Sequence, residues 1–413
     1  MSFPRYPQYK DSGVDWLGQV PAHWEVKPAK RALNRRKELN AGMKCENRLA
    51  LTMNGVVPRD LDDLDGLQAS EFETYQIFER DDLAFKLIDL QNIKTSRVGI
   101  VPEQGIMSPA YIRLQPDAQK VVPRYGYWFF TNLYNLCVFN ELGGGVRQTL
   151  GPEELLMLAV SLPPLPEQRE IAGFLDRETG KIDALVAEQE RLLELLKEKR
   201  QAVISHAVTR GLNPNAPLKP SGLAWLGDVP AHWKVGKLGY AAKLRGGFAF
   251  SAADFGQDGV AVVRMNNLRR GHLDLTDAAR IPDAVCEPGA ALSEGDLLWG
   301  MSGSTGETGS LGNFARVRAD DLPCQLNQRV GRFVADPASL EVTYLEWLIQ
   351  TAALYDQVLL LVTGTAQSNI SSEQVQSCMV ALPPLSEQRA IVAHLDAATA
   401  QFDALTAEVE RAL

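Results

Sequence analysis

Two segments of the chain carry apolar residues at the seven-residue spacing that is typical of coiled-coil helices. In the first segment the repeat runs from Leu175 to Val203, with Gln189 as its one polar member. In the second segment the same step recurs from Leu395 to Val409. Heptad spacing over several turns, with charged residues elsewhere, favours a coiled coil. The positions that we assign to contact along these helices are Leu175, Ile182, Leu185, Gln189, Leu192, Leu196, Val203, Leu395, Phe402, Leu405 and Val409.

The first of these helices is predicted to be long. Pro166 suits a first helical turn, and Gly211 followed by Pro214 ends the helix. About 44 residues at about 1.5 Å each correspond to a rod of about 66 Å. A domain of this size cannot cover such a rod, so we expect it to pair antiparallel with the second helix; the alternative is that each helix packs on its own domain.

The chain is an internal repeat. WLGQVPAHW at 16–24 returns as WLGDVPAHW at 225–233, and LPPLPEQR at 162–169 returns as LPPLSEQR at 382–389. When the two LPPLxEQR motifs are aligned, Leu413 corresponds to Leu193. The second helix is therefore expected to be shorter than the first, through either truncation or natural asymmetry. Shared motifs that frame dissimilar inserts indicate one framework used twice, with two different inserts.

Each insert alternates short apolar runs with turn residues and closes on an apolar helical stretch, at 125–139 and at 342–362. This pattern predicts an α+β fold in both. We therefore expect two globular domains joined by a long antiparallel coiled coil, related by a pseudo-twofold axis. The predicted division is 1–160 for the first motif and insert, 161–212 for the first helix, 213–235 for a linker and the second motif, 236–380 for the second insert, and 381–413 for the second helix.

Charge and composition restrict the function. The formal net charge is −9, and the inserts are not basic: 25–160 has 17 Lys plus Arg against 18 Asp plus Glu, and 236–380 has 11 against 16. Non-specific DNA affinity needs basic residues, so any DNA binding must be local or shared with a basic partner. The chain has no apolar run of membrane-spanning length and no signal-peptide core, so we expect it in the cytoplasm.

Loops in both inserts carry side chains that suit base recognition. Arg bonds guanine bidentately in the major groove, and Asn or Gln does the same with adenine. Such residues cluster at 264–270 in the second insert and at 86–97 in the first, while a basic cluster at 27–37 looks helix-like and is equally compatible with a solvated face. The candidate DNA-binding residues are Lys86, Gln91, Asn92, Lys94, Arg97, Arg264, Asn266, Asn267, Arg269, Arg270, Ser302, Ser304, Gln328 and Arg329.

The sequence offers little for catalysis. The five cysteines have no CxxC spacing and the five histidines form no HExxH, so we expect no metal site and no catalytic residue. The loop GSTGETGS at 303–310 lacks the Gly-Lys-Ser/Thr ending of a phosphate cradle. His23 and His232 occupy matching motif positions, for which we expect packing rather than acid-base work.

The ordered, duplicated motifs resemble one family. A WLGxVPxHW opening, a variable insert, a stretch such as GVRQTL or GTAQSNIS, LPPLxEQR and a long helix, all repeated, look like the specificity subunit of type I restriction-modification systems. The resemblance spans nearly the whole chain. The short second helix departs from the family pattern and puts partner docking at that end in doubt.

The resemblance implies that each insert is a target-recognition domain for half of a bipartite double-stranded DNA site, and that the helices set the spacing. It also implies two methyltransferase subunits that use S-adenosylmethionine, and restriction subunits that use ATP and magnesium for translocation and cleavage. No cofactor would then be bound by this chain. The alternatives are a two-domain protein adaptor that dimerises through its helices, or a self-sufficient nuclease.

Overall fold

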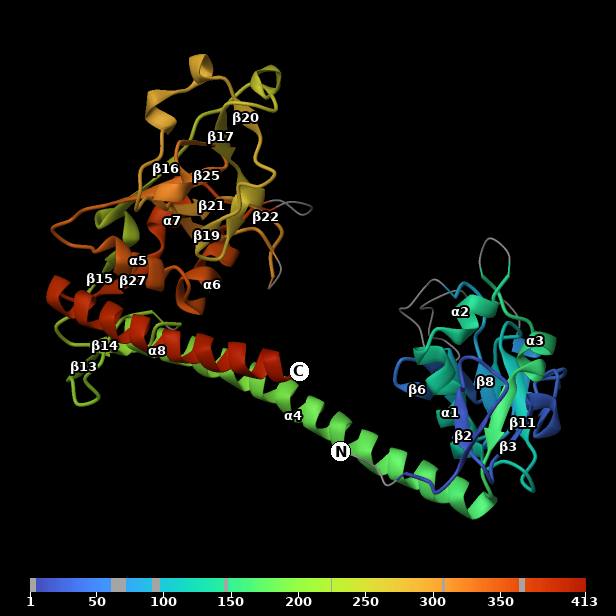
Figure 1. The fold of residues 1–413 in the computed structure, drawn as a ribbon. Coiled ribbons are helices and arrows are strands. Elements are labelled where there is room, and N and C mark those ends of the chain that lie inside the picture. The colour runs from blue at the N-terminus through green and yellow to red at the C-terminus, as the bar shows by residue number, and fades with distance from the viewer. Residues whose placement is uncertain are drawn as a thin grey trace. The chain divides into compact units, whose positions relative to one another are not determined.

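The computed structural model describes residues 5–60, 72–90, 97–144, 148–223, 225–306, 309–363 and 368–413. The chain forms two compact units, residues 1–185 (unit 1) and 186–413 (unit 2), which are described separately (Figure 1). The boundary between the units falls within helix α4 (Leu165–Arg210). The finer division into five segments stays a prediction.

Unit 1 contains two four-stranded sheets, with the strand orders β6-β5-β10-β7 and β4-β11-β8-β9. The ring of Phe130 in helix α1 meets that of Phe85 in strand β8 edge-on, with centroids 5.1 Å apart, so α1 packs on the second sheet. The strands are β4 (Leu33–Arg35), β5 (Arg48–Thr52), β6 (Gly55–Arg59), β7 (Gln76–Phe78), β8 (Leu83–Phe85), β9 (Val98–Ile100), β10 (Gly105–Met107) and β11 (Ile112–Pro116). The helices before α4 are α1 (Pro123–Asn135), α2 (Val138–Leu142) and α3 (Pro152–Met157).

Unit 2 repeats the mixture of sheet and helix. A four-stranded sheet has the order β16-β25-β21-β23, and a three-stranded sheet has the order β20-β17-β24. Two short pairs, β18-β19 and β22-β26, lie outside these sheets. The strands are β16 (Ala242–Gly246), β17 (Val260–Val263), β18 (Leu268–Arg269), β19 (His272–Leu273), β20 (Arg280–Ile281), β21 (Leu297–Gly300), β22 (Ser302–Gly303), β23 (Phe314–Arg316), β24 (Cys324–Leu326), β25 (Val330–Ala335) and β26 (Ser368–Asn369).

The helices of unit 2 that follow α4 are α5 (Val342–Leu348), α6 (Ala352–Leu361), α7 (Ser372–Ser377) and α8 (Leu385–Ala412). The predictions of one helical stretch over 125–139 and over 342–362 are both wrong. The first is interrupted at Cys137, whose backbone is left-handed, with φ 58°, between α1 and α2. Thr351 is fully buried in an extended conformation, and its hydroxyl donates to the carbonyl of Leu348 at 2.7 Å, so the chain turns between α5 and α6. The described residues also form single-turn 3-10 helices at Ala29–Arg31, Phe72–Thr74, Leu238–Tyr240, Ala252–Asp254, Met265–Asn267, Asp283–Val285, Pro288–Ala290 and Ala319–Asp321.

The repeated motifs meet in space and frame each insert. In unit 1, strand β3 (Glu25–Pro28), directly after the first WLGxVPAHW motif, pairs antiparallel with β12 (Ala159–Leu162), directly before the helix. In unit 2, β15 (Lys234–Lys237) pairs in the same way with β27 (Met379–Leu382). A small strand pair also precedes each: β1 (Tyr9–Asp11) with β2 (Gln19–Pro21), and β13 (Leu218–Pro220) with β14 (Asp228–Pro230). The predicted internal repeat and the α+β class are confirmed.

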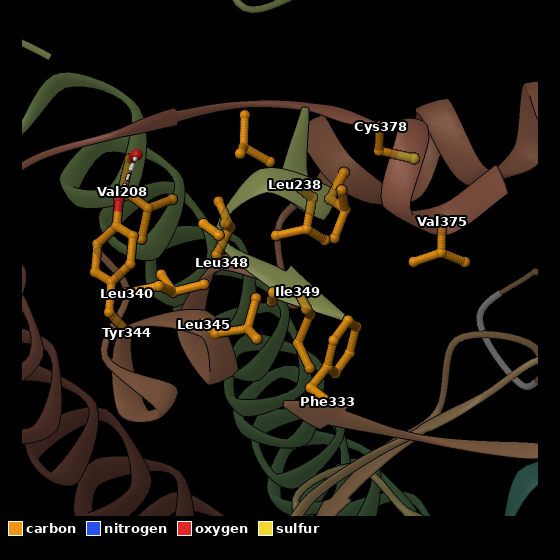
Figure 2. Packing of buried hydrophobic residues seen from close by; sticks show 14 of the residues in the cluster. Val208, Leu238, Phe333, Leu340, Tyr344, Leu345, Leu348, Ile349, Val375 and Cys378 are labelled. Atoms are coloured by element: carbon orange, nitrogen blue, oxygen red, sulfur yellow. Dashed lines mark hydrogen bonds between the residues drawn. The ribbon is translucent and has the colours of Figure 1, made fainter. Parts of the chain in front are cut away.

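The C-terminal part of α4 is part of the core of unit 2. Ile204, Ala207 and Val208 are at most 2% exposed and pack with Trp233 and Leu395. Figure 2 shows Tyr344 of α5 pointing at the backbone of Val208, to whose carbonyl its hydroxyl donates at 3.2 Å. The C-terminal part of α4 therefore packs both against α8 and against the second insert.

The predicted antiparallel pairing of the helices is confirmed in unit 2. Figure 1 shows α8 lying along α4 in the opposite direction, and Arg200 pairs with Asp403 at 3.5 Å. The assigned contact positions differ in burial. The buried ones are Leu395 and Val409, and the half-buried ones are Phe402, Leu196, Val203, Leu175 and Gln189. The exposed ones, at 39–59%, are Ile182, Leu185, Leu192 and Leu405. Helix α8 has 28 residues and α4 has 46, as the alignment of the halves predicts.

Candidate nucleic-acid interface

A buried glutamine of the LPPLxEQR motif ties each insert to its helix. In unit 1, the amide oxygen of Gln168 accepts from the backbone N–H of Val122, and its nitrogen donates to the carbonyls of Lys120 and Pro163, all within 3.0 Å. In unit 2, Gln388 accepts from Glu341 and donates to Ser339 and Pro383, each at 2.9 Å. Both glutamines are fully buried. The motif thus fixes where the closing helix of each insert begins.

The glutamate that precedes this glutamine in the LPPLxEQR motif contacts the WLGxVPAHW motif. In unit 1, Glu167 lies 2.9 Å from Nε2 of His23 and accepts hydrogen bonds from Trp24 Nε1 and the Tyr6 hydroxyl. In unit 2, Glu387 lies 2.7 Å from Nε2 of His232. The expectation of a packing role for the two histidines is therefore incomplete, because each holds the two motifs together through a carboxylate.

These contacts shift two pKa values in unit 1. Burial raises the pKa of Glu167, but the hydrogen bonds from Tyr6, His23 and Trp24 outweigh it and hold the pKa below its ordinary value. Burial and the bond to Glu167 raise the pKa of Tyr6 to about 12. The carboxylate is therefore the stable form at neutral pH.

In unit 2, the candidate base-contacting loops leave from the carboxyl ends of two neighbouring parallel strands. Strands β17 and β24 pair in parallel, with Val263 opposite Leu326, and the backbone N–H of Asn327 donates to Val263 at 3.1 Å. The segment 264–270 follows β17, and the segment 327–329 follows β24. Parallel pairing therefore brings two of the sequence-predicted clusters to one edge, here called the β17-β24 edge.

Asn267 shapes the first of these loops from within. It is 2% exposed; its side-chain oxygen accepts from the N–H of Arg264, and its nitrogen donates to the carbonyl of Asp274, both at 2.9 Å. Asn266, Arg269 and Arg270 are exposed around it. The sequence selected Asn267 as a base contact, whereas the structure gives it the role of holding the loop.

Two arginines of the same loop have internal contacts. The guanidinium of Arg264 lies over the ring of Phe255, 5.4 Å from its centroid. Arg269 pairs with Asp274 at 3.4 Å, and both side chains are at least 41% exposed. Such an exposed pair is weak and can open to water or to a ligand.

The remaining candidates of unit 2 lie beside the second loop. Gln328 and Arg329 are exposed, and Arg329 donates to the side chain of Asn369 at 3.4 Å. Ser304 is exposed, but Ser302 is 3% exposed within the β22-β26 pair, opposite Asn369. The backbone bond from Met301 to Arg329 links this pair to the β17-β24 edge.

In unit 1 the candidate set is less complete. Gln91, Asn92 and Lys94 lie outside the described residues. Arg97 is 1% exposed and donates to the carbonyls of Lys86, Ile88 and Asp89, so it braces a loop from inside. Lys86 is half-buried, and burial together with Arg97 lowers its pKa.

The basic cluster at 27–37 does not form one helix. It runs from β3 through the 3-10 turn Ala29–Arg31 into β4, because its apolar residues pack into the sheet. Arg35, Arg36 and Lys37 line a hollow of about 230 Å³ on unit 1. Arg35 pairs there with Glu153 at 3.2 Å.

One exposed aromatic residue at the β17-β24 edge was not among the sequence-predicted candidates. Phe248 is 45% exposed, and its backbone forms a parallel bridge to Asn327. In the sequence it lies in an apolar run, GGFAF, that looks like an ordinary strand. Its place beside Gln328 becomes apparent only from the pairing.

Among the residues that the structure describes, no group of three or more His, Cys, Asp or Glu side chains could hold a metal ion. In the same residues, no helix is both long and apolar enough to cross a membrane.

The chain is similar to curated proteins of known class. It is 25% identical over 295 residues to the type I restriction enzyme MjaVIII specificity subunit of Methanocaldococcus jannaschii, which covers 71% of this chain and 67% of that protein. It is 26% identical over 289 residues to the EcoKI specificity subunit of Escherichia coli strain K12, covering 68% and 60%. The chain thus spans about two thirds of the length of these relatives.

Solved structures share the fold. A chain from a structure of a type I restriction-modification system matches with a TM-score of 0.67 at 16% identity, covering 95% of this chain and 94% of that chain. The HsdS subunit from Thermoanaerobacter tengcongensis matches with a TM-score of 0.55 at 16% identity, covering 95% and 92%. A family model for the type I restriction modification DNA specificity domain matches residues 66–194 and 230–413. The chain therefore belongs to the type I restriction-modification DNA specificity family.

Proposed function

We propose that this chain is the DNA sequence-recognition subunit of a type I restriction-modification complex and has no active site of its own. The observation that carries this proposal is the β17-β24 edge of unit 2. Two adjacent loops expose five amide or guanidinium side chains there: Asn266, Arg269, Arg270, Gln328 and Arg329. Amide and guanidinium groups side by side are the donors and acceptors that distinguish base pairs in the major groove.

Each unit would bind one half of a bipartite site in double-stranded DNA. The duplicated framework supports this, because the same glutamine and glutamate contacts hold two different inserts. In this proposal the long helices set the distance between the half-sites. They also provide the surface for two methyltransferase subunits, to which the exposed Ile182, Leu185 and Leu192 of α4 contribute.

The chemistry would reside in the partners. Methyltransferase subunits would carry S-adenosylmethionine, and restriction subunits would carry ATP and magnesium for translocation and cleavage, all acting on DNA in the cytoplasm. The net charge of −9 supports this division, because basic partners must then supply much of the phosphate contact.

The test is a binding selection. The chain is reconstituted with the methyltransferase subunits from its source and offered duplexes with two randomised windows at varied spacing. We expect enrichment of one split sequence, and an Arg329→Ala variant should relax one half of it only. A matched control, Tyr240→Ala, changes a residue of unit 2 that is 80% exposed and lies outside the edge, so it should leave selection unchanged.

Two results would contradict the proposal. Recovery of random sequences by the reconstituted complex would exclude sequence recognition. Stable assembly with unrelated proteins, together with no affinity for methyltransferase subunits, would favour the adaptor alternative.

A further inference from the structure

Phe248 combines exposure with a fixed position. Its backbone N–H donates to the carbonyl of Leu326 at 2.9 Å, and its carbonyl accepts from the N–H of Gln328 at 3.0 Å. The side chain is nevertheless 45% exposed. The residue is therefore locked to the loop that carries Gln328 and Arg329, although its own ring contributes only part of its surface to the core.

The preceding glycine makes this position possible. A Cβ at Gly247 would lie 2.0 Å from the carbonyl oxygen of Leu326 and 2.3 Å from its carbon, distances that no side chain tolerates. Only glycine lets the two backbones approach this closely. The local sequence thus brings the Phe248 backbone against the end of β24.

The ring of Phe248 also packs against other aromatic rings. It meets Phe250 edge-on at a centroid distance of 5.1 Å, and Phe250 is 8% exposed and meets Phe255 at 6.5 Å. Phe255 in turn lies under the guanidinium of Arg264. The buried ring of Phe250 therefore contacts both the half-buried Phe255, beside Arg264, and Phe248, whose partly exposed ring is an ordered apolar group next to Gln328.

We propose that Phe248 recognises thymine in the half-site of unit 2 by contacting its C5-methyl group in the major groove. This inference rests on the proposed function. The methyl group of thymine is the apolar feature that base pairs present there, and an aromatic side chain is a suitable partner for it. The amide and guanidinium groups of the β17-β24 edge would recognise the neighbouring base edges by hydrogen bonds. The ring of Phe248 would add an apolar contact with the methyl group, which hydrogen bonds cannot recognise.

The test removes single methyl groups from DNA. The reconstituted complex is titrated with its selected duplex, in which each thymine of the unit 2 half-site, on either strand, is replaced in turn by deoxyuridine. At one position we expect Kd to rise about four-fold, the equivalent of one buried methyl group at about 0.8 kcal/mol. With Phe248→Ala, Kd should be raised on thymine DNA, and the same replacement should have no further effect.

Matched variants separate recognition from folding. Phe248→Leu keeps an apolar side chain and should retain part of the thymine preference. Tyr240→Ala removes another exposed aromatic ring of the same unit and should leave the preference intact. The melting temperature of Tyr240→Ala should lie close to that of the parent chain, because that side chain is 80% exposed. Phe248→Ala and Phe248→Leu should lower it modestly, because the ring of Phe248 is 45% exposed and packs on Phe250.

The outcomes distinguish this inference from the function on which it rests. Specific binding with no thymine coupled to Phe248, or a half-site without thymine, overturns the inference and leaves the proposed function standing. Equal loss on selected and random DNA in Phe248→Ala would indicate a wedge or a backbone contact and also overturns it. Absence of any specific binding contradicts the proposed function instead.

Discussion

Gln388 accepts a hydrogen bond from the backbone N–H of Glu341, at 2.9 Å, although 47 residues separate them along the chain. Gln168 makes the corresponding bond to Val122 over 46 residues. The two bonds lie at the N-terminal ends of α5 and α1, where helices leave backbone N–H groups without partners. One buried amide in each unit therefore closes an insert onto its framework.

Replacing Gln388 with Ala should destabilise unit 2 by about 2–4 kcal/mol. The change leaves one backbone N–H and two carbonyls without their partner. The Pro383 carbonyl is buried and the groups of Ser339 and Glu341 are half-buried, and a fully buried group left unpaired costs about 1–3 kcal/mol before the structure relaxes. Hydrogen-deuterium exchange resolved by peptide should show faster exchange in 339–341 and 383–388, with unit 1 unchanged. Gln168→Ala should give the converse pattern, and loss of protection spread evenly over both units would contradict the assignment.

The stability of unit 1 should depend on the ionisation of Glu167. Its pKa in the folded protein lies below the ordinary value of 4.5, so its stabilising contribution is complete above that value and is lost as the pH falls through the lowered pKa. Denaturant unfolding of the parent chain and of Glu167→Gln, measured between pH 7 and pH 3, should show a difference that shrinks toward the acid end. A difference independent of pH would mean that the charge of Glu167 is not what stabilises the contact.

Asn267 and Arg269 should differ in what their loss affects. Asn267→Ala removes two buried hydrogen bonds and should cost about 1–3 kcal/mol of stability as well as recognition of the unit 2 half-site. Arg269→Ala removes an exposed side chain and should weaken that half-site with little effect on stability. Competition binding with duplexes scrambled in one half-site, combined with thermal melting, separates the two. Equal weakening of both half-sites would argue against one unit per half-site.

Insertion of seven residues after Gln189 of α4 should lengthen the tolerated gap between half-sites. Seven helical residues add about 10.5 Å and nearly two full turns, which corresponds to about three base pairs of duplex. Repeating the binding selection with the lengthened chain measures the gap directly. An unchanged gap would exclude the helices as the element that sets the spacing.

The sequence predicted the framework better than the interface. Helix-ending residues are a local signal: Gly211 followed by Pro214 predicted the end of α4, whose last residue is Arg210. The sequence pattern could not show the break between α5 and α6 at Thr351, because the buried contacts of that residue depend on tertiary packing. Residue type made Asn267 and Arg97 candidates for DNA contact, but both side chains are buried in the structure, and no local sequence pattern reports burial.

The contacts that organise the site link residues far apart in the chain. The bonds of Gln168 cross 46 residues, so the motif could be recognised without its role being visible. Phe248 was not among the sequence-predicted candidates, because an apolar residue in a strand-like run is expected to be buried in the core. The strand pairing that brings it to Asn327 supplies the missing information.

The ion pair of Arg269 with Asp274 has a kinetic consequence under the proposed function. A guanidinium that already has an internal partner gains little from a random phosphate, since it exchanges one weak contact for another. Only a base edge that offers bidentate geometry gives it a clear advantage. Arg269 should therefore add little to the residence time of the complex on unrelated DNA and more to its residence time on the correct half-site.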